Sequence, residues 1–418
     1  MKLSKLMLTA SIAAAALAAC QKENVTEVQD QPINKSIVLN LANVMPATKG
    51  TGNTIADGTQ VTLNNYQVFF ADAAGKFYTP KDKTAAADAE TFFSFTATTP
   101  DVDPDVVKQF HFLPQSVTKV VVVGNAGTAK LNATTYDELM EDVKNLAIEN
   151  QQKPDSLVLY GMDASLTAMP ADTEHETDNE DVHPSPLFKA EINLRPAVAR
   201  FEVTGFEYSQ TPVAEGETAP ARLFSQMTVE NLSVIHWNQN ATVALADNAI
   251  TVTASDPDTY FNGYYNDDTM YPEYLVPVKK NLPAGAWYFD TINKTIPTDG
   301  YLLGAKNVTA AGTSCWSYHV FPGALPRFIA ELTGVNNVGG TNITTKMYLQ
   351  TTALGNLTDE TVAAGNIYRM HFNFNDNDLR AAEKCIQVEI TVAKWNVVAV
   401  TPSFGKNETT ETPETPAE

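Results

Sequence analysis

Short runs in which apolar residues alternate with polar ones recur along almost the whole chain, separated by residues that favour turns. Successive side chains of a strand point to opposite faces, so these runs predict half-buried strands. Lys119–Gly124 is apolar after its lysine and ends at Asn-Ala-Gly, which predicts a central strand. Apolar residues also alternate through Ile367–Phe374, Cys385–Trp395 and Asn396–Phe404. Many short strands at this spacing predict a mainly β protein built from β-sandwiches.

One stretch follows the helical period instead. Thr135, with Glu138 three residues later, forms a capping box, a sign of a helix start. The apolar residues expected on the buried face of this helix are Tyr136, Leu139, Met140, Val143 and Ala147. We therefore expect one short helical region in the N-terminal half of an otherwise β chain.

The earliest predicted strand is Ser36–Ala42, where Ile37, Leu39 and Leu41 share one face. Burying these three side chains would stabilise the fold by roughly 5–9 kcal/mol, at about 1.5–3 kcal/mol each, which is as much as the whole stability of many domains. The polar residues 21–35 before it predict a tether. The segment Thr48-Lys49-Gly50 after it predicts an exposed site for a protease, so the first strand looks removable.

The N-terminus predicts export with a lipid anchor. Met1–Ala19 carries two lysines and a short apolar run, as a signal peptide does, and the run is too short to span a bilayer. Small residues lead into Cys20, the predicted lipid-attachment residue. Cys315 and Cys385 remain, and the sequence leaves open whether they pair in an oxidising compartment or stay as buried thiols.

Charge excludes one class of partner. The 418 residues carry 28 Lys and Arg against 49 Asp and Glu, a net charge of −21. A surface this acidic repels phosphate backbones, so we expect no nucleic-acid partner. The predicted organisation along the chain is a signal peptide (1–19), a lipidated propeptide with the first strand (20–49), an N-terminal β-sandwich domain (50–186), a C-terminal β-sandwich domain (187–404) and a disordered acidic tail (405–418).

The motifs of several enzyme classes are missing from the sequence. It holds no Gly-x-Ser-x-Gly elbow and no phosphate-binding glycine loop, and His175-Glu176 does not continue into a zinc-protease helix. The acidic clusters at Asp101–Asp105 and Asn375–Asp378 lack the glycine and distal glutamate of a calcium loop. We expect no catalytic residue, no metal and no cofactor. Arg200, in a predicted strand, is expected to form a structural ion pair, as is Arg195.

Several stretches together resemble the Bacteroidales fimbrillins, the lipoprotein-precursor subunits of type V pili. They include the lipid-attachment box with its early strand, and the Gln21-Lys22-Glu23 segment resembles the surface-export signal of Bacteroidales lipoproteins. The other matching stretches, in the same order as in that family, are Lys119–Gly127 followed by Thr135–Leu139, Leu194–Val203, Gly365–Met370 and Val388–Trp395.

The resemblance implies two transthyretin-like β-sandwich domains and assembly by strand exchange. The precursor would be held in the outer membrane through the lipid on Cys20, and an extracellular trypsin-like protease would cut between Lys49 and Gly50. The groove-filling strand with Ile37, Leu39 and Leu41 would then be replaced by a donor strand from another copy or a related pilin. The candidate donor residues are Val398, Val400 and Phe404.

Processing in the family follows an arginine, and the first arginine here is Arg195. Either a lysine-accepting protease would act at Lys49, or the subunit would stay uncut and serve as the anchor. The implied function is a cell-surface fimbrium that supports adhesion and biofilm formation, through a receptor that the sequence does not identify. The alternatives are a monomeric surface lipoprotein that binds glycan or protein and, third, a surface hydrolase with active-site carboxylates.

Overall fold

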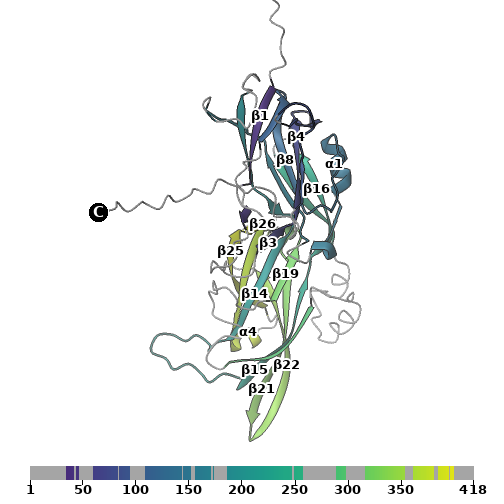
Figure 1. Ribbon diagram of the computed structural model, residues 1–418. Coiled ribbons are helices and arrows are strands. Elements are labelled where there is room, and N and C mark those ends of the chain that lie inside the picture. The colour runs from purple at the N-terminus through teal and green to yellow at the C-terminus, as the bar shows by residue number, and fades with distance from the viewer. Residues whose placement is uncertain are drawn as a thin grey trace, which may run out of the picture.

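The computed structural model describes residues 34–41, 44–46, 60–82, 84–94, 109–143, 145–151, 156–170, 173, 186–246, 249–257, 289–297, 316–353, 361–380, 385–394 and 396–399. The molecule is elongated, with β1 near one end and the hairpin β21–β22 at the other (Figure 1). Nearly all of its regular structure is strand, which confirms the predicted mainly β class. Within the described ranges, no helix is long and apolar enough to cross a membrane.

Two sheets form the upper part of the molecule in Figure 1. The four-stranded sheet has the order β11 (Thr167–Ala168), β12 (Leu187–Ile192), β1 (Asn34–Leu41) and β7 (Gln109–Pro114). The six-stranded sheet has the order β13 (Arg195–Pro196), β10 (Leu159–Asp163), β8 (Val117–Gly124), β4 (Asn65–Asp72) and β5 (Phe77–Tyr78), with β6 (Phe92–Ser94) beside β4. Strand β12 contacts β10 and β8 of the other sheet, so the two sheets enclose a shared apolar core.

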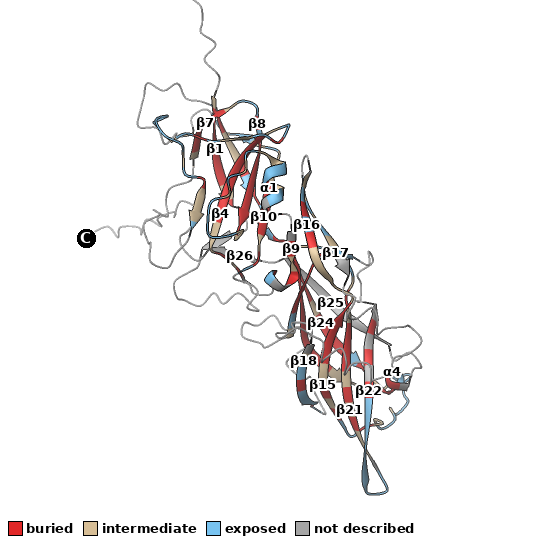
Figure 2. Cartoon of the chain, turned by 90° about the vertical axis from the view of Figure 1, so that its right-hand side faces the viewer, coloured by how far each residue is buried: buried red, intermediate tan, exposed pale blue. Residues whose placement is uncertain are grey.

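One sheet of eight strands dominates the lower part. Its order is β18 (Phe289–Ile296), β15 (Gln226–Ile235), β21 (Arg327–Val338), β22 (Thr341–Ala353), β25 (Cys385–Lys394), β24 (Asn366–Phe374), β14 (Ala199–Tyr208) and β19 (Trp316–Val320). Buried residues run along β14 and β24 and recur along β15 and β21 (Figure 2). As the alternation predicts, Tyr368, Met370, Phe372 and Phe374 of β24 are all buried.

Three smaller sheets complete the described fold. They are β17 (Ala249–Pro257) with β16 (Asn238–Ala246) and β9 (Asn145–Ala147), then β2 (Val44–Pro46) with β26 (Asn396–Ala399) and β3 (Gln60–Leu63), and the pair β20 (Gly323–Ala324) and β23 (Thr361–Val362). The first and second of these sheets join segments that lie far apart in the sequence.

The predicted helix is shorter than its apolar pattern. Helix α1 spans Tyr136–Val143 and is followed by β9 and the 3₁₀ helix η1 (Ile148–Gln151). The hydroxyl of Thr135 accepts the Glu138 amide as predicted, but the Glu138 carboxylate accepts the amide of Thr134, one residue earlier. Placing Ala147 on the helix was wrong, because residues 145–147 pair with β16 instead.

The predicted turn at Asn375–Asp378 is a short helix, α4 (Asp376–Arg380), so the C-terminal half is not β throughout. The Asp376 carboxylate accepts the Tyr208 hydroxyl and, at 2.8 Å, the Leu223 amide. Its oxygens therefore hold the connection between β14 and β15 in place. The predicted boundary near Leu187 stays a prediction; the strands before and after it, β11 and β12, pair with each other.

Candidate functional site

The first strand of the fold is an interior strand of its sheet. Strand β1 runs parallel to β12, with Ser36 opposite Leu187 and Leu41 opposite Ile192, and antiparallel to β7 on its other edge. We call the position between β7 and β12 the β1 site. Because a central strand is hydrogen-bonded on both edges, its loss would open two edges at once. The residues that begin the described fold therefore occupy an interior position in it.

One face of β1 is apolar and fully packed. Ile37, Leu39 and Leu41 are buried and join the core between the two upper sheets, as the period of two predicts. Their direct neighbours on β12 are Phe188, Ala190 and Ile192. Val38, on the opposite face, is also buried. The structure thus brings together the three residues that the sequence assigned to the groove-filling strand.

The start of β1 is polar and equally buried. Lys35 keeps only 5% of its surface exposed, donates to the Val117 carbonyl and places its ammonium nitrogen 4.7 Å from the centroid of the Phe188 ring. Burial lowers the pKa of Lys35 from its usual value. The expectation that residue 35 belongs to a solvated tether was wrong. A lysine beside an apolar run looks like a surface residue in sequence, and only the fold shows its carbonyl and aromatic partners.

Ser36 lies against a bulge in β7. Its backbone amide donates to the Pro186 carbonyl over 3.0 Å, and its hydroxyl oxygen lies 3.1 Å from Nδ1 of the buried His111. The register between β1 and β7 shifts here, and Phe112 has a φ of 57°, the left-handed backbone that bulges often require. The bulge aims His111 at Ser36, a contact that the sequence did not reveal.

The outer face of the β1 site is a polar patch. The carboxylate of Glu191 accepts hydrogen bonds from Lys189 and from the side chain of Asn40. The lysine contact is the largest cause that lowers the pKa of Glu191. Glu191 is exposed and its two partners are partly exposed, so these contacts contribute less to the stability of β1 than its buried side chains.

The other predicted site residues fall in different places. Val398 lies in β26, whose backbone pairs in parallel with Met45 of β2 on one side and with Thr62 of β3 on the other. The remaining predicted residues, which are Cys20, Lys49, Gly50, Val400 and Phe404, lie outside the described residues. Because β2 precedes and β3 follows Lys49, the two strands that flank β26 lie on opposite sides of the predicted cut.

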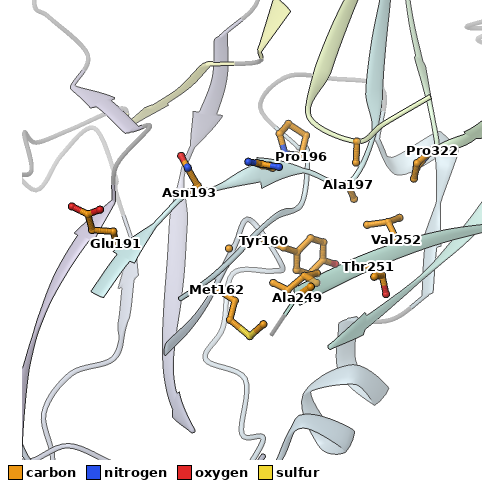
Figure 3. Close-up of a pocket in the computed structure, with 14 residues that line it drawn as sticks. Tyr160, Met162, Glu191, Asn193, Pro196, Ala197, Ala249, Thr251, Val252 and Pro322 are labelled. Carbon is orange, nitrogen blue, oxygen red and sulfur yellow. The ribbon is translucent and has the colours of Figure 1, made fainter. Parts of the chain in front are cut away.

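A pocket of about 570 Å³ lies next to the end of β12 (Figure 3). Tyr160 and Met162 of β10, Glu191 and Asn193 around the end of β12, and Thr251 of β17 line it from three parts of the chain. Its volume is typical of small-ligand sites, but Glu191 is paired with Lys189 and the Tyr160 hydroxyl donates to the Val143 carbonyl. Within the described residues, no group of His, Cys, Asp or Glu side chains could hold a metal.

The predicted ion pair of Arg200 is confirmed, and it is part of a buried network. The Glu202 carboxylate, 1% exposed, accepts Nε of Arg200 at 2.7 Å and Nε of Arg369 at 3.1 Å. His319 Nδ1 donates to the Gln151 carbonyl at 2.6 Å, and its Nε2 accepts Arg200 at 3.3 Å. Burial, and next the nearby Arg200, lower the pKa of His319 to about 3.

Three comparisons relate the chain to known proteins. No family profile matches the sequence, and no curated protein matches it either. A proposed cell adhesion protein from Bacteroides eggerthii has 14% sequence identity and a TM-score of 0.45, over 88% of this chain and 98% of that one. Solved structures that resemble this chain include fimbrial and adhesion proteins.

Two further neighbours come from Porphyromonas gingivalis. A fimbrilin shares 10% identity with a TM-score of 0.41, over 87% of this chain and 98% of that one. A fimbrial anchor protein shares 11% identity with a TM-score of 0.32, over the same shares of the two chains. Both are fimbrial proteins, as are the subunits of the family that the sequence motifs resemble.

Proposed function

We propose that this chain is the precursor of a pilus subunit whose β1 is a temporary strand, replaced during assembly by a strand of another subunit. The interior position of β1 carries this proposal. Segment 34–41 contributes a largely buried strand with partners on both edges, yet it precedes the predicted cut at Lys49. After cleavage only non-covalent contacts would retain it.

Exchange of β1 requires an incoming strand that repeats its contacts. Backbone groups of β7 and β12 would pair with any extended segment, and alternate aliphatic side chains would fill the space of Ile37, Leu39 and Leu41. A strand passed from one subunit to the next is a heterologous contact, which propagates into a filament. The burial of the three side chains, worth roughly 5–9 kcal/mol, explains why the site would not stay empty.

The other parts of the proposal come from the sequence. The chain would be exported, anchored in the outer membrane through Cys20 and cut by an extracellular trypsin-like protease. On the cell surface the fimbrium would support adhesion and biofilm formation. The two-domain division, with a propeptide of residues 20–49, belongs to the same proposal. The role needs no catalytic residue and no cofactor.

Surface-exposed protein from cells that express the chain tests this function. We expect N-terminal sequencing to find Gly50 at the start of the mature form, and electrophoresis without boiling to show a ladder of multimers. The variant Lys49→Gln should keep its N-terminal segment and give no ladder. Lys346→Gln, a change at an exposed lysine of β22, is the matched control and should leave both readouts unchanged. A Gly50 form that stays monomeric among all its co-expressed pilus subunits would refute the proposal.

A further inference from the structure

The β1 site has two chemically different halves. Ile37, Leu39 and Leu41 fill an apolar half that accepts any aliphatic strand. Lys35 and Ser36 fill a polar half at the start of the strand, and both are buried. An apolar groove can discriminate only weakly among aliphatic segments, whereas a buried polar site rejects a segment that leaves its groups without partners. The polar half is therefore the part that can select an occupant.

The partners in the polar half belong to the body of the protein and would stay behind when β1 leaves. The Val117 carbonyl accepts the Lys35 ammonium, and the Phe188 ring lies 4.7 Å from it. His111 faces the Ser36 hydroxyl at 3.1 Å. An ammonium satisfies the carbonyl and the π face together, and a hydroxyl can either donate to the imidazole or accept from it.

We propose that the β1 site, if it exchanges strands as proposed above, selects an incoming strand by a basic residue followed by a serine or threonine. Large apolar residues then follow at three alternate positions, in the places of Ile37, Leu39 and Leu41. In this sequence only Lys35–Leu41 has that pattern of Lys or Arg, Ser or Thr, and then Ile, Leu, Val, Met or Phe at alternate positions. The occupant is a strand of this chemistry from a partner subunit.

Residues 395–418 of a second copy do not fit the site. Their one basic residue is Lys406, and aligning it with Lys35 puts Glu408, Thr410 and Thr412 in the apolar half. Aligning the apolar residues Val400, Pro402 and Phe404 with Ile37, Leu39 and Leu41 puts Val398 and Ala399 in the polar half. Pro402 would then occupy the middle of a central strand, where its missing amide hydrogen breaks a ladder bond.

The backbone pairing of β26 also argues against residues 395–418 as the occupant of the β1 site. Residues 397–399 pair with β2 and with β3, so both edges of this strand are already used within the chain. After loss of β2, the pairing with β3 would still hold these residues. The part of the predicted donor that contains Val398 is therefore engaged in its own molecule.

Peptide competition on the nicked protein tests this selection. The full chain, cut after Lys49 with a trypsin-like protease, is incubated with a fluorescent peptide of residues 32–44, and binding is followed by polarisation. Unlabelled competitors are the same peptide, its Lys35→Met and Ser36→Ala forms, and a peptide of residues 395–418. An Asn34→Ala form is the matched control, because the bond to Asn34 that the structure shows uses its backbone carbonyl.

We expect the peptide of residues 32–44 and its Asn34→Ala form to compete equally. The Lys35→Met form should be at least about tenfold weaker, the Ser36→Ala form about five- to tenfold weaker, and residues 395–418 at least about a hundredfold weaker. Equal competition by residues 395–418, or unchanged binding of both the Lys35→Met and Ser36→Ala forms, would overturn the selection alone. If the 32–44 peptide itself does not enter the nicked protein, the proposed function falls too.

Discussion

Two buried charges, Lys35 in the upper part of the molecule and Glu202 in the lower part, are satisfied in opposite ways. Glu202 lies between two arginines, and all three belong to strands of one sheet, β14 and β24. Lys35 has a backbone carbonyl and an aromatic ring as partners, both neutral. Removing one member of a paired buried set leaves an uncompensated charge, which costs several kcal/mol.

This difference is what we expect if the Glu202 network is permanent and β1 is replaced during assembly, as proposed above. If Lys35 were paired with a buried carboxylate, the departure of β1 would strand that carboxylate in the core. With Val117 and Phe188 as partners, the charge leaves together with the strand, and the two groups that it contacted are neutral. Neutral partners therefore lower the free-energy cost of losing the strand. Separating the members of the Glu202 network would instead leave a buried charge uncompensated.

The largest expected effect breaks the permanent network. Glu202→Gln removes the buried carboxylate that Arg200 and Arg369 share, so we expect the free energy of unfolding to fall by about 3–5 kcal/mol, measured by urea denaturation at pH 7. Glu191→Gln, which removes a carboxylate from an exposed ion pair, is the control and should change stability far less. Similar losses in the two variants would show that the Glu202 network is not a buried charge cluster.

Next in size is the apolar half of the β1 site. Ile37→Ala removes most of a side chain that is fully buried, and we expect a loss of about 2–4 kcal/mol in the uncut chain. In the nicked chain the same variant should release its N-terminal segment faster, as followed by size-exclusion chromatography. An Asn34→Ala chain is the comparison and should behave like the unchanged protein. Retention of the Ile37→Ala segment at the unchanged rate would contradict the view that these side chains hold β1.

A smaller effect is expected at the polar half. Lys35→Met removes a buried charge but leaves the Val117 carbonyl without its lysine partner, so we expect a loss of about 1–2 kcal/mol. The ratio between this loss and that of Glu202→Gln, both from urea denaturation, measures the contrast between the two charges directly. A loss at Lys35 as large as that at Glu202 would mean that Lys35 has a charged partner.

The smallest expected effect, for a change of one pH unit, is the pH dependence of stability that His319 causes in the network around Glu202. The pKa of His319 in the fold is about 3, below its usual 6.5, so between these values the unfolded chain binds the extra proton. Stability contributed by neutral His319 is complete above pH 6.5 and is lost as the pH falls towards 3, by at most about 1.4 kcal/mol per pH unit.

Comparing the unchanged chain with His319→Gln separates the pH dependence caused by His319 from that caused by the carboxylates and the other histidines. The glutamine amide can still donate to the Gln151 carbonyl, while the titrating group is gone. We expect the difference in unfolding free energy between the two proteins to shift by about 1 kcal/mol between pH 6 and pH 5. A difference that stays constant with pH would show that His319 is solvated in the native fold.

The strands of the fold were largely predictable because each carries its own local pattern. The central strand β8 and the aromatic face of β24 follow from alternation alone, as does the apolar face of β1. The end of helix α1 was not predictable, because the apolar period continues to Ala147 while β16 captures residues 145–147 as a strand. Tertiary pairing overrode the local preference there.

The polar half of the site could not be predicted, because its partners come from distant segments. Nothing in the sequence around Lys35 marks Val117 or Phe188 as its neighbours. The left-handed backbone that turns His111 towards Ser36 is at Phe112, so no glycine signals it in the sequence. The two parallel partners of β26 were equally hidden, because parallel pairing carries no hairpin signal. The sequence could identify which face of β1 is buried, but not what its lysine touches.

The parallel pairing of β1 with β12 also bears on the order of folding. Ser36 meets Leu187 only after β7, β8, β10 and β11 have been made, so this contact closes one of the longest loops in the upper sheets. Contacts of such high sequence separation form slowly. The edges of β7 and β12 would thus stay open until β1 pairs with them late in folding. Refolding should show a late kinetic phase that is absent when the 32–44 peptide is supplied in excess to a chain that has lost its own copy.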